Sequence, residues 1–142
     1  MSNTPRPHVM AALLGAVAIG GAAGTLLRDL ALKLDTTSWY ISVVGAHGWA
    51  SRVPWVLALI NLLGVYFATF ALRGPLVRHD PNNVTRLFVI TGFFGGFTSY
   101  SSLYVALGAI WHISASGALL TALLAVLSGI LAAWLGARSW SQ

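Results

Sequence analysis

Four long apolar stretches of the chain contain no charged residue, and polar connections separate them. They cover residues 9–27, 53–72, 87–111 and 113–137. A helix of about 20 residues rises about 30 Å, which is the thickness of the hydrocarbon core of a bilayer. The pattern therefore predicts an all-α membrane protein. We expect a single four-helix domain over residues 1–142, with spans at about 9–31, 53–72, 87–111 and 113–137.

The residues that flank these stretches are typical of helices that cross a membrane. Aromatic side chains that gather at headgroup level in such proteins include Trp39, Tyr40, Trp55, Trp111 and Trp134. With four spans, both termini lie on the same side of the membrane. The side that holds the termini has five arginines, Arg6, Arg73, Arg78, Arg86 and Arg138. The other side has Lys33 and Arg52, with Arg28 close to that end of its span. The positive-inside rule then favours cytoplasmic termini by a modest margin.

The composition agrees with a protein whose surroundings are a lipid bilayer. Hydrophobic residues make up 57% of the chain and charged residues 8%, whereas soluble domains carry about a quarter charged residues. The net charge of +5 comes from scattered single cations, so no nucleic-acid partner is expected. We expect a multi-pass protein of the cell membrane. A secretory signal peptide is an alternative for the first stretch, although the apolar run continues to Leu27.

The interiors of the four stretches contain no Asp, Glu, Lys or His. A proton-coupled carrier needs an ionisable group at membrane depth, and a hydrolase needs a nucleophile with a base or a set of metal ligands. The chain has no cysteine, and His8, His47, His79 and His112 lie at or beyond the ends of the stretches. We therefore expect neither an enzyme nor a proton-coupled carrier.

The third stretch carries the string GFFGGFTSYSS over residues 92–102, which weakens a helix near its centre. Adjacent Gly95 and Gly96, followed by β-branched and hydroxylated residues, disfavour helical backbone. Irregular backbone at membrane depth is tolerated only where it is buried in protein or lines a cavity. The string therefore predicts a helix break, whose free carbonyls would bind a cation and whose free N–H groups would bind an anion. Gly92 and Gly96 also form a small-xxx-small pair for close helix packing, as do Gly20 and Gly24.

Neutral polar side chains inside the other stretches leave two interpretations open. An unpaired amide in hydrocarbon costs several kcal/mol, so Asn61 either bonds a neighbouring helix or presents its N–H groups to an anion. Ser114, Thr121 and Ser128 recur every seven residues along one helical stripe. These hydroxyls either bond the carbonyls of their own helix or form a ladder of donors.

These motifs resemble the Fluc/CrcB family of fluoride channels, and the likeness covers nearly the whole chain. The third-helix pattern of that family, close to G-F-x-G-G-[FL]-T-T-F-S-[ST]-F, is similar to residues 92–103. Its first-helix pattern G-G-x-x-G-x-x-x-R resembles Gly20 to Arg28, and its second-helix N-x-x-G resembles Asn61 to Gly64. The resemblance implies a fluoride-selective channel subunit for passive fluoride efflux. It also implies an antiparallel, dual-topology dimer, of the chain with itself or with a paralogous subunit, and a broken third helix.

The resemblance also implies roles for particular residues. A structural sodium ion, which is not transported, would be held by the main-chain carbonyls of Gly95 and Thr98. The pore would be lined by Asn61, Tyr100, Leu103 and Ser128, and Arg28 would lie at a vestibule or an interface.

Three positions depart from the pattern of the family. Tyr100 and Leu103 stand where the family has two phenylalanines along the pore, and Leu124 stands where it often has a tyrosine. Leucine has no ring edge to offer an anion. A non-conducting structural partner in a heterodimeric fluoride channel is therefore an alternative. A third interpretation is a small scaffold subunit of a larger membrane complex.

Overall fold

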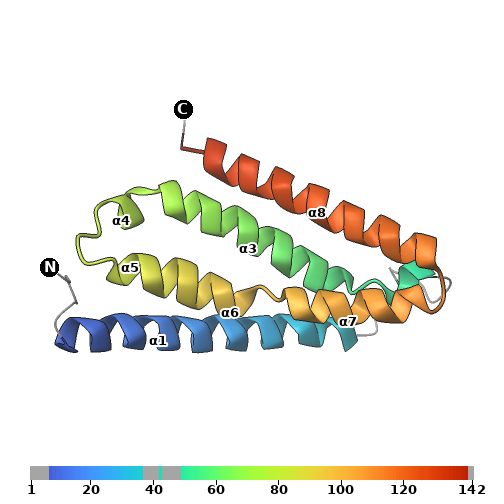
Figure 1. The fold of residues 1–142 in the computed structure, drawn as a ribbon, viewed down its shortest axis with the longest axis horizontal. Helices are drawn as coiled ribbons and strands as arrows, with labels where there is room; N and C mark the ends of the chain where they lie inside the picture. The colour runs from blue at the N-terminus through green and yellow to red at the C-terminus, as the bar shows by residue number, and fades with distance from the viewer. Residues whose placement is uncertain (1–6, 37–41, 43–48, 141–142) are drawn as a thin grey trace, which may run out of the picture.

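The computed structural model describes residues 7–36, 42 and 49–140, and within them every regular element is helical. Three helices are long and apolar enough to cross a membrane: α1 (Pro7–Leu32), α3 (Trp55–Arg73) and α8 (Ala115–Arg138). Helix α8 packs against α3, whereas α1 lies on the opposite side of the molecule from α8 (Figure 1). The chain is thus a multi-pass membrane protein. Arg6, Trp39, Tyr40 and His47, which entered the expectations above, lie outside the described residues.

The third predicted span is composed of several pieces, and the prediction of a helix break in it is confirmed. After α5 (Val84–Arg86) come a π-helix, η3 (Leu87–Phe94), one turn of α-helix, α6 (Gly95–Phe97), and then α7 (Tyr100–Trp111). Thr98 and Ser99 between α6 and α7 are extended, with φ/ψ of −84°/150° and −146°/101°. No piece of this segment is by itself as long as the three helices named above.

The break lies just after the glycine pair of the segment. Gly95 and Gly96 both belong to the helical turn α6, and Gly95 has φ −63° and ψ −37°. The break at Thr98 and Ser99 lies within residues 92–102, the stretch in which the sequence predicts it. Ser99 explains this position, because its side chain accepts a hydrogen bond from the Ser102 N–H and caps the start of α7.

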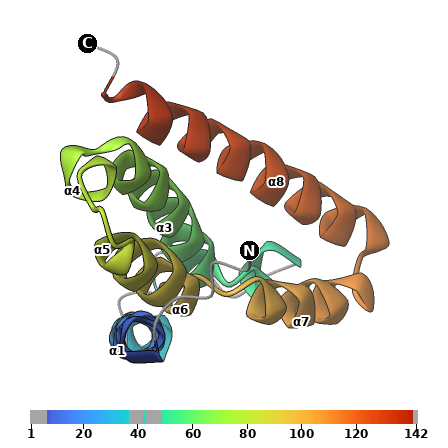
Figure 2. The same cartoon turned by 60° about the vertical axis from the view of Figure 1, so that its left-hand side comes forward.

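The glycines allow the backbones of α1 and the first half of the broken segment to touch. A Cβ placed on Gly92 would lie 2.8 Å from Val17 O and 3.0 Å from the Cα of Gly20. A Cβ on Gly24 would lie 2.9 Å from Phe97 N. The small-xxx-small pairs therefore form the contact between α1 and η3–α6, as the sequence indicated. The two elements run alongside each other in both views (Figures 1 and 2).

Helix α3 lies between α8 and the broken segment, and α7 joins α8 through a tight turn at His112 (Figure 2). The small buried cluster of Val53, Ile110 and Ala118, with Trp49 of η2 (Trp49–Arg52) packed against it, ties α7 and α8 to the start of α3. Most other large apolar side chains of α1 and α8 are exposed, as expected for helices in lipid.

Short helical elements follow α1 and α3, and α1 ends next to the expected boundary at residue 31. The turn η1 (Lys33–Thr36) follows α1, and α4 (Pro75–Arg78) follows α3. The charge-free stretch ended at Leu27, but helix α1 continues to Leu32 and so includes Arg28 and Asp29. These two residues form an ion pair, with Arg28 Nη2 3.3 Å from Asp29 Oδ1, so the pairing compensates the charges within the helix.

Replacing Gly92 by alanine should destabilise the protein, because the new Cβ would force apart two backbones in contact. We expect a loss of about 1–3 kcal/mol, typical of overpacked sites, seen as a lower melting temperature of the purified protein in detergent. Gly15→Ala is the matched control, since a Cβ at Gly15 on α1 meets nothing within 4 Å. Equal melting temperatures for the two variants would contradict the role assigned to Gly92.

Candidate functional site

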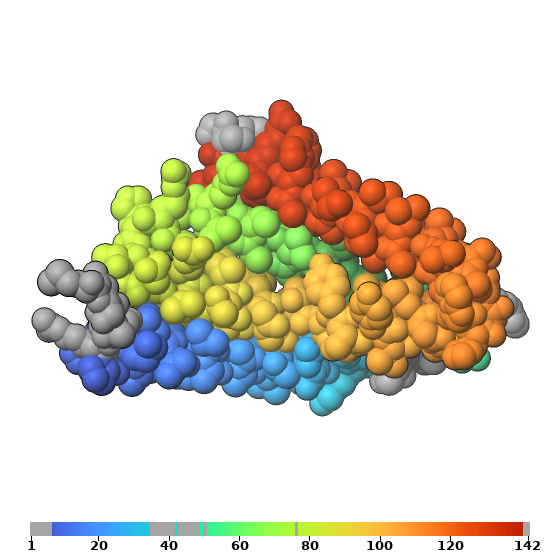
Figure 3. All heavy atoms as spheres, in the orientation of Figure 1, coloured from blue at the N-terminus to red at the C-terminus, as the bar shows by residue number. Residues whose placement is uncertain are grey.

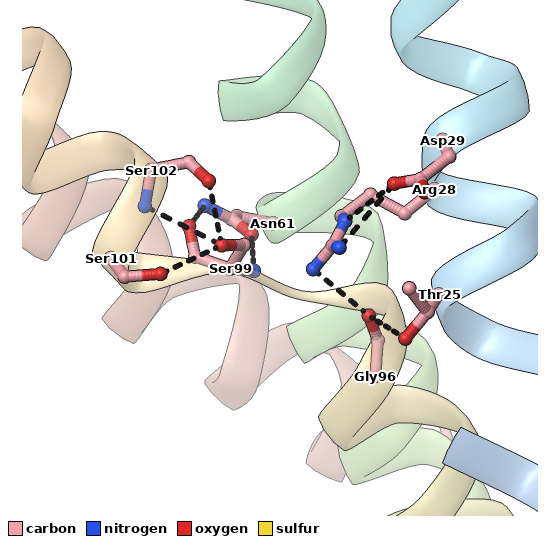
Figure 4. Close-up of polar contacts among 8 residues, drawn as sticks. All are labelled: Thr25, Arg28, Asp29, Asn61, Gly96, Ser99, Ser101 and Ser102. Carbon is pink, nitrogen blue, oxygen red and sulfur yellow. Dashed lines mark hydrogen bonds and ion pairs between the residues drawn. The ribbon is translucent and has the colours of Figure 1, made fainter. Parts of the chain in front are cut away.

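A side-chain amide closes the backbone gap that the helix break creates. The Asn61 Oδ1 accepts a hydrogen bond from the Ser99 N–H at 2.8 Å, and its Nδ2 donates to the Ser99 carbonyl at 3.2 Å (Figure 4). Both residues are buried, each with 8% of its surface exposed. The amide thus satisfies the Ser99 N–H, which would be costly to leave unpaired away from water, and gives the Ser99 carbonyl an additional donor. The interhelical interpretation of Asn61 is confirmed, and one N–H of its amide remains without a partner among the described residues.

The same arrangement diverts two backbone donors from the broken helix. In a continuous α-helix, the Ser99 N–H would bond the Gly95 carbonyl and the Ser102 N–H would bond the Thr98 carbonyl. Here the Ser99 N–H goes to Asn61, and the Ser102 N–H lies 3.4 Å from Ser99 Oγ. The Gly95 and Thr98 carbonyls released in this way are the two that the family resemblance implies as ligands of a cation. Carbonyl oxygens are suitable ligands for a hard cation, so this donor set fits a sodium ion.

The last turn before the break is held from α1. Arg28 Nη1 donates to the Gly96 carbonyl at 3.3 Å, and Thr25 Oγ1 lies 3.5 Å from the same oxygen (Figure 4). A cation beside the last carbonyls of a helix opposes the negative end of its dipole. The Arg28 guanidinium therefore lies at the last helical turn before the break and does not extend toward the membrane surface at the end of α1.

The residues expected to line a pore lie around one cavity, although they come from three separate parts of the sequence. Asn61 of α3, Tyr100 and Leu103 of α7, and Ser128 of α8 all line a cavity of about 40 Å³. Its other walls are small or apolar, formed by Ala58, Leu62, Val65, Ala125 and Gly129. None of these side chains carries a charge, and the buried amide of Asn61 is the strongest polar group among them.

A larger hollow continues from this cavity toward the start of α3. It has a volume of about 390 Å³ and shares Leu62, Leu103 and Ser128 with the cavity. Thr121 and Leu124 of α8 and Trp49 of η2 also line it. Together the two form a groove between α3, α7 and α8, and no Asp, Glu, Lys or Arg lines it. We call it the α3–α8 groove.

The three hydroxyls of the α8 stripe bond locally. Ser114 caps the start of α8 by accepting the Gly117 N–H at 3.0 Å. Thr121 Oγ1 donates to the Gly117 carbonyl at 2.8 Å, and Ser128 Oγ donates to the Leu124 carbonyl at 2.6 Å. Of the two interpretations, the structure confirms bonding to the helix's own backbone. Thr121 and Ser128 nevertheless line the groove, so rotation of χ1 would turn either hydroxyl toward it.

Sequence reasoning missed the central role of Ser99. It counted Ser99 as one hydroxyl among several, whereas the structure makes it both the partner of Asn61 and the N-cap of α7. Its hydroxyl also lies 2.9 Å from the Ser102 hydroxyl. A serine that follows a glycine-rich turn and precedes helix-forming residues is a start signal for a helix, and that signal was present in the sequence.

The fold and the site define a small multi-pass helical membrane protein in which an interrupted helix lies beside an uncharged groove. The chain belongs to the CrcB family, because the family model described as CrcB-like protein, Camphor Resistance (CrcB), matches residues 15–137.

Several similar proteins bear the name fluoride-specific ion channel FluC. The relative from Thermus thermophilus is 35% identical over 123 residues, covering 86% of this chain and 88% of the relative. The relative from Mesorhizobium japonicum is 34% identical over 121 residues, covering 84% of this chain and 89% of the relative. Other matches are shorter: those with relatives from Legionella pneumophila and Cutibacterium acnes span 58% and 62% of the length of those proteins.

Replacing Asn61 by alanine should destabilise the fold, since it leaves the buried N–H of Ser99 without a hydrogen-bond partner. An unsatisfied buried group costs about 1–3 kcal/mol, so the melting temperature should fall clearly. Asn82→Ala is the matched control, because Asn82 is exposed in the connection before α5. Unchanged melting of Asn61→Ala would mean that Asn61 does not hold the break.

Proposed function

We propose that this protein is a subunit of a fluoride-selective channel that lets fluoride leave the cytoplasm passively. The observation that carries the proposal is the uncharged cavity, where Asn61, Tyr100 and Ser128 converge. Membership of the CrcB family and the names of the relatives support fluoride as the ion. The action is transport and not catalysis.

The chemistry of the lining suits a small, strongly hydrated anion. Fluoride can enter a narrow path only if polar donors replace its water, and a fixed cation there would trap it. The free N–H of Asn61 provides one neutral donor, and Tyr100, whose side chain has a ring edge and a hydroxyl, lines the same cavity. Ser128 would add a donor by rotating its hydroxyl from the Leu124 carbonyl into the groove. Apolar walls limit the water that accompanies the ion.

Leu103 and Leu124 offer no donor to this path. Both lie on the groove, so the donors are concentrated around Asn61 and are not spread evenly along it. A non-conducting structural partner would tolerate such a lining, but the relatives of known name are channels, which favours conduction.

The working unit in this proposal is an antiparallel dimer whose copies meet at the break. Residues on the outer face of α7 support a partner there: Tyr104 is 77% exposed and Val105 is 76% exposed. The Tyr104 hydroxyl has no hydrogen-bond partner within the described part of the chain, and a phenol facing lipid would leave it unsatisfied. The partner is a second copy or a paralogous subunit, and the fourth crossing of each subunit is the composite segment of η3, α6 and α7.

A structural sodium ion at the dimer axis fits the two released carbonyls. Gly95 O and Thr98 O from each of two copies would give four oxygen ligands, a reasonable number for a hard cation. The ion would neutralise the partial negative charge of the carbonyls where the helices end. Asn61 and Ser99, through their hydrogen bonds, would keep the helix interrupted at that point.

Purified protein reconstituted in liposomes, alone or with a paralogous subunit, should pass fluoride and exclude chloride. A fluoride-selective electrode measures the efflux, and equal passage of chloride would refute the proposal.

The lining can be tested apart from the fold through Ser128. Its hydroxyl bonds only its own helix, so Ser128→Ala should leave melting unchanged and reduce fluoride efflux several-fold. Ser116→Ala, at an exposed hydroxyl of α8, is the matched control and should conduct normally.

Asn61→Asp should abolish efflux, because it places a carboxylate beside the cavity and also loses the donor to the Ser99 carbonyl. Normal efflux from well-folded Asn61→Asp and Ser128→Ala would remove both residues from the path.

Gly95→Val should separate assembly from folding. Within one chain, a Cβ at Gly95 meets only the Ile90 carbonyl, at 4.0 Å, so any crowding must come from a second copy. We expect the variant to keep the helical content of the wild type, measured by circular dichroism, but to elute as a monomer in size-exclusion chromatography. Thr98→Ser should stay dimeric, and its melting temperature should rise in sodium over potassium as in the wild type, since a carbonyl ligand survives that change. A dimeric Gly95→Val protein, or no difference between the two cations, would argue against the axial site.

A further inference from the structure

Three arginines gather at the end of the molecule where α3 and α8 finish. Arg73 is the last residue of α3, Arg78 the last of α4 and Arg138 the last of α8. The ends of α3 and α8, green and red, meet at the top of the molecule (Figure 3). Two hollows lie there, of about 260 and 320 Å³, and Arg73 and Ala137 line both of them.

The charged side chains among the described residues that line these hollows are all arginines. Arg73 and Arg78 line the first hollow with Leu72 and Trp140, and no Asp or Glu lines either one. The nearest acidic residue in the sequence, Asp80, accepts the backbone N–H of Arg86 at 3.0 Å and so is engaged with the start of α5. Neither Arg73 nor Arg78 forms an ion pair with another described residue.

The position of the hollows is that of phospholipid headgroups. Helix α3 has 19 residues and spans about 28 Å, close to one hydrocarbon thickness, so its last residue lies at the membrane surface. Trp134 and Trp140 flank the hollows, as indole rings do at that depth. The Trp140 ring is fixed by a hydrogen bond from its Nε1 to the Phe70 carbonyl at 2.9 Å.

The hollows are separated from the α3–α8 groove. A Cβ at Gly136 would collide with Thr69 Oγ1 and with the Tyr66 carbonyl, so the backbones of α8 and α3 touch between the two regions. An ion at Arg73 thus has no open way into the groove through this contact. That separation favours a resident ligand over an ion on its way through the protein.

We propose that the hollows around Arg73 bind the phosphate of an anionic phospholipid, such as phosphatidylglycerol. The guanidinium groups of Arg73 and Arg78 match phosphate oxygens in pairs, and basic pockets between membrane helices commonly hold anionic headgroups. The acyl chains would lie along the exposed apolar surface of α8, next to Trp134. The proposal is independent of fluoride conduction.

Native mass spectrometry of the intact protein, titrated with phosphatidylglycerol or phosphatidylcholine, tests this. The wild type should bind phosphatidylglycerol more tightly than phosphatidylcholine. Arg73→Gln should weaken the binding of phosphatidylglycerol about fivefold, the typical effect of one surface arginine. The binding of phosphatidylcholine should not change. Arg73→Lys should lose less, since it keeps the charge.

Arg86→Gln is the matched control, because Arg86 is exposed at the same end of the molecule and lines neither hollow. Melting temperatures of all variants verify that they fold. Equal affinity of the wild type for the two lipids, or equal losses in Arg73→Gln and Arg86→Gln, would overturn the proposal. Displacement of phosphatidylglycerol by millimolar inorganic phosphate would instead assign the site to a soluble anion.

Discussion

The structure depends on the rule that backbone polar groups inside a membrane must find partners within the protein. The chain interrupts a helix there, and Asn61 bonds the backbone N–H and carbonyl of Ser99 at the break, at 2.8 and 3.2 Å. A side-chain amide carries a donor nitrogen and a strong acceptor oxygen on the same carbon atom, so it can bond an N–H and a C=O at once. A carboxylate lacks the donor and a hydroxyl lacks the reach, so this position is narrowly specified.

The rest of the fold supports that pairing. The glycines let α1 approach the segment before the break. Arg28 and Thr25 of α1 then donate hydrogen bonds to the carbonyl of Gly96. The segment after the break starts with its own cap at Ser99. Each half of the interrupted helix is therefore anchored to a different neighbour: the first half to α1, the second to α3 through Asn61 and to α8. The groove lies where the second half diverges from the first.

The sequence was sufficient to predict the helical membrane class, three of the spans and the presence of a break. Those features follow from local properties of the sequence. A long apolar stretch without charged residues is most favourable in the lipid bilayer, and a glycine pair followed by hydroxylated residues weakens a helix. The position of the break was not predictable in the same way. Gly95 and Gly96 belong to the helical turn α6, which packs on α1 through Gly96, and the chain opens at Ser99, where Asn61, 38 positions away, offers bonds.

Both interpretations of the polar stripe on α8 were physically reasonable, and only the rotamers seen in the structure decide between them. A hydroxyl on a helix always has a carbonyl of the previous turn within reach, so sequence spacing alone says nothing about where Thr121 and Ser128 donate. The convergence of Asn61, Tyr100, Leu103 and Ser128 on one cavity likewise depends on how the helices pack together. The resemblance to a known family supplied that grouping, and spacing along the chain did not.

The π-helix η3 makes the length of one part of the chain critical. Its wider turns accommodate the eight residues from Leu87 to Phe94 between the polar connection and the glycine contact with α1. Each residue turns an α-helix by about 100°, so a single deletion in this segment would rotate everything after it away from α1 and α3 at once. Related sequences should therefore tolerate exchanges of side chains here far better than gaps. The number of residues between the polar connection before α5 and the helix break therefore determines where the site residues lie.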